Sequence, residues 1–169
     1  SVSAAGEASN GLCAFPSISD DGRFSAFESE GSNLVPGDFN GKRDVFLYEV
    51  KTGALTRVSK PTGGETDGDS MRCSLSADGR FVTYFSLAKN LVAGDANNTV
   101  DVFVWDAREG RSILASPASD GTPSRGGSQF PILSGDGSVV AFHAFATDLV
   151  ADDRNLAADV FVRVLREAP

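Results

Sequence analysis

The sequence predicts an all-β protein, and three observations carry that prediction. Glycine (18 of 169 residues) and phenylalanine (12 residues) are both frequent, a composition typical of strands joined by tight turns. Asp-Gly pairs separate short runs of alternating apolar residues, which is a signal for β-hairpins. No segment sustains the 3.6-residue apolar spacing of a helix, so helices are expected to be nearly absent.

The chain contains three copies of one repeat, which supports the same fold class. The block Pro-Ser-Ile-Ser-Asp-Asp-Gly-Arg-Phe and its two counterparts occupy residues 16–24, 73–81 and 131–139. The block Asn-Leu-Val-Pro-Gly-Asp-Phe-Asn and its counterparts occupy residues 33–40, 90–97 and 148–155. An Asp-Val-Phe triplet then begins at Asp44, Asp101 and Asp159, so the offsets are 57 and 58 residues. Ordered blocks at one spacing indicate a repeat architecture.

Each repeat divides into four short strands. In the first copy the expected strands are residues 15–19, 24–29, 45–50 and 55–59. Asp21-Gly22 and Thr52-Gly53 supply hairpin turns between them. Units of four antiparallel strands, repeated along the chain, predict β-propeller blades in a single repeat domain spanning residues 1–169. The expected blades cover residues 11–60, 70–117 and 128–167.

The third repeat has no fourth strand of its own, and the N-terminal residues offer one. Ser1-Val2-Ser3 is similar to Arg57-Val58-Ser59, so residues 1–5 are expected to pair with the strand at 160–165, in the same chain or in a partner. Propellers usually have four to eight blades. Two chains with two-fold symmetry would form a six-bladed ring. The alternatives are a fragment of a longer propeller and a small three-bladed ring.

These blocks resemble the repeats of bacterial TolB-type, WD-repeat-like β-propellers. The resemblance depends on three patterns in fixed order, Ser-x-Asp-Gly-Arg, Asn-Leu-Val-x-Gly-Asp-x-Asn and Asp-Val-Phe, and covers nearly the whole chain. It implies a propeller that is exported to the periplasm or cell exterior and acts mainly through protein contacts. It implies no single chemistry, because the fold hosts many functions.

Composition narrows the classes of partner. The formal net charge of −8 gives an acidic surface that repels phosphate backbones, so nucleic acid is not expected as a partner. No run of 18 apolar residues occurs, so no membrane span is expected. Cys13 and Cys73 form no Cys-x-x-Cys motif, which leaves either two unpaired thiols or a disulfide.

The strand order divides the connections between two faces. Short turns share one face, and longer loops share the other, at residues 30–43, 60–71, 87–100, 117–129 and 145–158. Binding residues concentrate on long loops that a rigid scaffold holds, so this long-loop face is the predicted site for a protein or small ligand. Its candidate residues are Asp38, Asn40, Asp44, Asp95, Asn97, Asp101, Asp153, Asn155 and Asp159.

The spacing Asp-x-Asn-x-x-x-Asp in these loops has two interpretations. Calcium takes six to eight oxygen ligands, and Asp38, Asn40 and Asp44 would begin such a shell. A ligand is then expected at the fifth position, where Lys42 stands in the first copy. The alternative is a set of Asx turns, in which Asp and Asn side chains accept local backbone N–H groups and no cofactor is needed.

Motifs for catalysis are scarce. The one histidine, His143, stands where the other copies have Glu28 and Phe85, so a structural role is favoured. No nucleophile elbow, His-Glu-x-x-His motif or phosphate loop occurs. The predicted function is therefore a non-enzymatic binding or scaffold module. The alternatives are a metal-dependent propeller hydrolase with carboxylate ligands on the long-loop face, and a structural fragment of a longer propeller.

Overall fold

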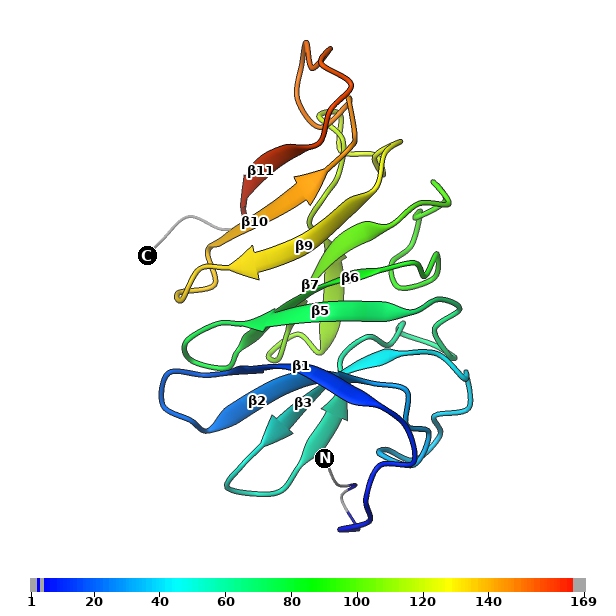
Figure 1. The fold of residues 1–169 in the computed structure, drawn as a ribbon, viewed down its shortest axis with the longest axis vertical. Coiled ribbons are helices and arrows are strands. Elements are labelled where there is room, and N and C mark those ends of the chain that lie inside the picture. Colours follow the sequence, from blue (N-terminus) through cyan, green and yellow to red (C-terminus); the bar gives the residue numbers. More distant parts are fainter. Residues whose placement is uncertain (1–2, 4, 166–169) are drawn as a thin grey trace.

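The computed structural model describes residues 3 and 5–165 of the chain, and this part consists of three antiparallel β-sheets without a helix (Figure 1). The first sheet, blade 1, has the order β1 (Cys13–Ile18), β2 (Phe24–Ser29), β3 (Asp44–Glu49), β4 (Leu55–Arg57). Blade 2 has the order β5 (Ser70–Leu75), β6 (Phe81–Ser86), β7 (Asp101–Asp106), β8 (Arg111–Leu114). Blade 3 contains β9 (Ser128–Leu133), β10 (Val139–Ala144) and β11 (Asp159–Val164). No described helix is long and apolar enough to span a membrane.

These strands agree closely with the sequence prediction. The second predicted strand, 24–29, matches β2 at both ends, because Asp21-Gly22 fixes where the hairpin turns. The third predicted strand, 45–50, begins one residue after β3 begins. The first predicted strand, 15–19, begins two residues after β1 begins. Propeller blades of four antiparallel strands are therefore confirmed for the first two repeats.

The expected closing strand cannot be located in the same way. Residues 1, 2 and 4 lie outside the described residues, and so does their expected pairing with the strand at 160–165. The described N-terminal segment, blue in Figure 1, lies beside blade 1, at the opposite end of the molecule from β11. In the described part of the chain, β11 pairs with β10 alone.

The hydrophobic core lies between the blades rather than inside one sheet. One cluster joins Val45 and Leu47 of blade 1 to Tyr84, Phe103 and other apolar residues of blade 2. The next cluster joins blade 2 to blade 3, and it is built from Phe81, Phe85, Val102, Val104, Ala115, Leu133, Val140, Phe142, Ala144, Ala146 and Leu149. Blade 2 therefore buries both of its faces, so a blade is stable only beside neighbours.

Glycines at the hairpin turns allow the blades to approach closely. A Cβ atom on Gly79 would lie 2.2 Å from the Phe24 ring of the preceding blade, and one on Gly137 would lie 2.4 Å from Phe81. The Asp-Gly turn therefore serves the packing between blades as well as the hairpin.

The strands β1, β5 and β9 lie side by side across the three sheets (Figure 1). Each contains a β-bulge, and each bulge has a residue with a left-handed backbone: Phe15 (φ 51°), Arg72 (φ 56°) and Phe130 (φ 52°). These three positions are spaced by 57 and 58 residues, so the bulge belongs to the repeat. Bulges redirect a side chain relative to its strand, and these three side chains meet on one surface.

Candidate functional site

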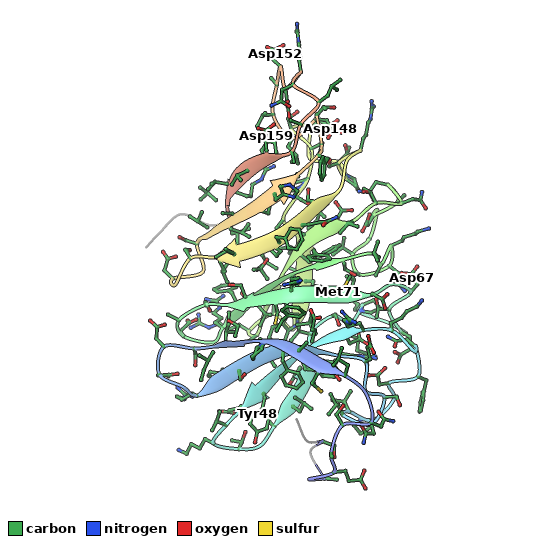
Figure 2. The ribbon with its side chains drawn as sticks, viewed as in Figure 1. Tyr48, Asp67, Met71, Asp148, Asp152 and Asp159 are labelled. Atoms are coloured by element: carbon green, nitrogen blue, oxygen red, sulfur yellow. The ribbon has the colours of Figure 1, made fainter. Side chains whose placement is uncertain are left out.

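The long loops gather on one side of the molecule, as the strand order predicts. In Figure 1 the short turns lie toward the left, and the long loops lie toward the right and the top. Figure 2 shows Asp148, Asp152 and Asp159 together at the loop end of blade 3, and Asp67 on the loop side of blade 2. The acidic loops of the three repeats therefore share the long-loop face.

The Asx turns predicted for these loops are confirmed in all three copies. The Oδ1 atoms of Asn40, Asn97 and Asn155 each accept the backbone N–H two residues later, at 2.8, 3.1 and 2.8 Å. The same asparagines donate from Nδ2 to the aspartate that begins the following strand, at 2.9, 2.6 and 2.8 Å. Asparagine thus ties the loop to the first residue of β3, β7 or β11.

In blade 1 the loop carboxylates surround a buried guanidinium. Nη1 of Arg57 lies 2.8 Å from Asp38 Oδ1 and 3.4 Å from Asp44 Oδ2, and Nη2 lies 2.7 Å from Glu65 Oε2. The Ser59 hydroxyl donates to Asp44 Oδ1 at 2.6 Å. Asp38, Asn40 and Asp44, the candidate calcium ligands, are therefore brought together around a positive charge that the chain itself supplies. Calcium at this loop stays a prediction.

Blade 2 repeats the loop without that cation. Asp101 is buried, accepts the Ser116 hydroxyl at 3.2 Å, and receives Asn97 as described above. Leu114 stands where blade 1 has Arg57, because it pairs with Phe103 just as Arg57 pairs with Phe46. The buried Asp95 Oδ1 has no hydrogen-bond partner among the described residues.

The electrostatics of the two loops differ accordingly. Burial raises the pKa of Asp44 to about 6, while hydrogen bonds from Ser59 and Asn40 and the charge of Arg57 oppose that rise. Burial raises the pKa of Asp101 further, to about 7, and the neighbouring Asp95 carboxylate adds to the rise. The absence of an arginine in the second loop accounts for the direction of this difference.

The third loop is open to solvent. Asn155 and Asp152 are exposed, while Asp153 and Asp159 are half-buried. Asp159 accepts Asn155 as its counterparts do, but among the described residues it has no serine donor like Ser59 or Ser116. This loop therefore belongs to an edge of the molecule.

The described residues contain no group of three or more His, Cys, Asp or Glu side chains placed to hold a metal ion. His143 packs against aromatic rings, with centroids 6.1 Å from Phe130 and 5.0 Å from Phe145. The packing role expected for the single histidine agrees with these contacts. Cys13 and Cys73 are not joined by a disulfide, and burial raises the pKa of the Cys73 thiol to about 12.

A second surface, formed by the bulges of β1, β5 and β9, was not expected from the sequence. The guanidinium carbon of Arg72 lies 3.7 Å from the Phe15 ring centroid and 5.7 Å from that of Phe130. Its backbone N–H donates to the buried Glu28 Oε2 at 2.7 Å. Phe15, Arg72 and Phe130 line an open hollow of about 300 Å³. Two of the three bulge residues are phenylalanine and one is arginine, none of them glycine, so the sequence gave no signal for a left-handed backbone there.

Comparison with known proteins shows the fold. No family model and no curated protein matches the chain. Among solved structures, a putative TolB from Agrobacterium tumefaciens has a TM-score of 0.56 at 18% identity, covering 91% of this chain and 46% of that one. The β-propeller domain of the trilobed protease from Pyrococcus furiosus has a TM-score of 0.50 at 10% identity, covering 94% and 45%.

Enzymes occur among the similar structures as well. A prolyl endopeptidase structure has a TM-score of 0.53 at 13% identity and is covered over 21% of its length, against 93% of this chain. The chain thus spans less than half the length of each of these proteins. At these identities the similarity shows the fold alone. The chain has a β-propeller fold like that of TolB-type proteins.

Proposed function

We propose that the chain is a non-enzymatic binding module whose blades 3 and 1 join those of a second copy, edge to edge, to form a six-bladed ring. The observation that supports this best is the outer face of β11. Val160 and Val162 are 76% and 65% exposed, whereas their counterparts Val45 and Leu47 are 0% and 7% exposed. In blade 1 the side chains at those positions pack against blade 2. The same apolar face of blade 3 is therefore suited to pack against a further blade.

The backbone contacts between blades repeat in a way that a second copy can continue. Asp20 N donates to Ala77 O at 3.0 Å, and Ala77 N donates to Gly135 O at 2.7 Å. By the same rule, Gly135 N donates to Asp20 O of a second copy. Gly22 is the counterpart of Gly79 and Gly137 and has open space where they meet a ring, so it accommodates the partner's Val139. Such a head-to-tail contact closes into a ring when the rotation allows it.

A fourth strand for blade 3 belongs to the same proposal. Asp159 lacks the serine donor of its counterparts among the described residues, and Ser3 is the sequence counterpart of Ser59 and Ser116. Residues 1–5 of a second copy would pair with β11 and bring Ser3 to Asp159. This pairing would also remove the exposed strand edge.

The ring would present its long loops on one face as a surface for a protein or small ligand. Long loops on rigid blades support that role, as does the exposed aromatic residue Phe39 in the 30–43 loop. TolB-type propellers imply protein contacts and a location outside the cytoplasm, and we predict both for this chain.

A charge on the exposed face of β11 tests the assembly. Val162→Glu places a carboxylate in the proposed interface and should convert a dimer into a monomer without loss of β-sheet circular dichroism. Ile113→Glu, at an exposed apolar position on β8 of the middle blade, is the matched control and should leave the dimer intact. A wild-type chain that is monomeric at every concentration would refute self-association and point to further blades in a longer polypeptide.

A further inference from the structure

Blades 1 and 2 build the same loop around the same buried carboxylate. Asn40 donates to Asp44 Oδ2 at 2.9 Å, and Asn97 donates to Asp101 Oδ2 at 2.6 Å. A serine hydroxyl donates to Oδ1 of each aspartate, at 2.6 and 3.2 Å. The same donor and acceptor atoms form these bonds in both loops. A difference in charge between the loops is therefore due to the other residues around the aspartate.

The difference is one positive charge. In blade 1, Arg57 Nη1 lies between Asp38 Oδ1 and Asp44 Oδ2. In blade 2 the counterpart of Arg57 is Leu114, which carries no charge. Asp95, the counterpart of Asp38, is only 7% exposed, and its Oδ1 atom has no partner among the described residues. That oxygen corresponds to the one that contacts Arg57 in blade 1.

We propose that blade 2 binds one calcium ion between Asp95 and Asp101, at the place that the Arg57 guanidinium takes in blade 1. A buried carboxylate oxygen without a partner is costly, and a bound cation removes that cost. A divalent ion balances the two carboxylates, and calcium prefers hard oxygen ligands such as these. All the residues belong to one chain, so this inference is independent of ring assembly.

The other ligands of this calcium ion would be neutral oxygens. Glu65, which holds Arg57 Nη2 in blade 1, has Thr122 as its counterpart in blade 2. Calcium takes six to eight oxygens, so water must complete a shell that contains only two carboxylates. The position sits at the base of the long-loop face, where the cation would fix the 87–100 loop against β7.

Calorimetric titration of the chelator-treated full chain with CaCl₂ tests the proposal. We expect saturable binding of one calcium per chain and a melting temperature that rises with calcium concentration. MgCl₂ and NaCl at equal ionic strength should not reproduce the rise. Asp95→Asn should abolish binding, whereas Asp38→Asn, the matched change in blade 1, should leave the stoichiometry at one.

Exchanging the residues at positions 57 and 114 gives a second test. Leu114→Arg should abolish the calcium response and raise the melting temperature of the chelator-treated protein, because the guanidinium replaces the ion. Arg57→Leu should add a second calcium per chain. If Leu114→Arg does not fold, the two asparagine variants still decide the question. The proposal is overturned if the wild type binds no calcium, or if Asp95→Asn binds it as the wild type does.

Discussion

At the scale of single residues, the repeat provides its own controls for backbone strain. Gly41, Asn98 and Leu156 occupy equivalent positions, and all three have left-handed backbones, with φ of 63°, 58° and 54°. Glycine adopts this conformation freely, but a residue with a Cβ atom pays about 1–2 kcal/mol for it. Leu156 is 86% exposed and so gains nothing from burial in return.

Leu156→Gly should therefore stabilise the chain, by about 0.5–1 kcal/mol after the extra flexibility of glycine in the unfolded state is subtracted. Urea unfolding of both proteins measures this difference. Gly41→Leu is the reverse change and should destabilise. A loss of stability in Leu156→Gly would show that the leucine side chain contributes a contact that outweighs the strain.

The pair of Arg80 and Asp106 predicts how acid weakens the fold. Two hydrogen bonds from Arg80, at 2.9 and 2.6 Å, are the main cause that lowers the pKa of Asp106. A carboxyl group whose pKa is lower in the folded state stabilises the protein above the unfolded-state pKa of about 4. That stabilisation is lost as the pH falls through the lower, folded-state pKa.

Asp106→Asn should therefore destabilise the chain near neutral pH, and the difference from the wild type should shrink as the pH falls below about 4. Unfolding free energies across this pH range measure the effect. In an Arg80→Gln background the pH dependence of the difference should be weaker. Equal differences at every pH would show that Asp106 gains nothing from its charge.

At the scale of elements, strands β3, β7 and β11 each carry one phenylalanine at the same position of the repeat. Phe46 and Phe103 are fully buried, and Phe161 is half-buried at the edge blade. Each ring stacks on an aromatic residue of the neighbouring strand, at 5.8, 5.8 and 6.0 Å between centroids.

Phe103→Ala should cost about 3–5 kcal/mol of unfolding free energy, because it leaves a cavity between blades 1 and 2. Chemical denaturation measures the loss. Phe39→Ala removes the same ring from an 87% exposed position and should change stability little. Equal losses in the two variants would contradict the packing described for β7.

Strand patterns and turns could be predicted from the sequence because their causes are local. An Asp-Gly turn and alternating apolar residues define the bounds of β2. The Asx turns could be predicted because each asparagine accepts the backbone N–H of the residue two positions later. The position of Arg57 between two loop carboxylates could not be predicted, because it depends on the β3–β4 register. The bulges at Phe15, Arg72 and Phe130 were missed because phenylalanine and arginine, unlike glycine, give no signal for a left-handed backbone.

At the scale of the whole molecule, the two ends of the stack are unlike its middle. Blade 2 is covered on both faces by its neighbours, while blade 3 exposes the valines of β11 and blade 1 exposes Leu12 and Ile18. The contact between neighbouring blades occurs twice in the chain, between blades 1 and 2 and between blades 2 and 3. Blade 3 exposes one side of this contact, and blade 1 exposes the other. We propose that the exposed faces of blades 3 and 1 meet between two copies, which turns a three-blade stack into a six-bladed ring.

The solution mass of the wild-type chain distinguishes a closed ring from a single three-blade stack. Light scattering coupled to size-exclusion chromatography should give twice the 17.6 kDa mass of one chain, with no larger open polymers, because a ring leaves no free end. A mass of 17.6 kDa at all concentrations, or a ladder of growing oligomers, would contradict the closed six-bladed ring.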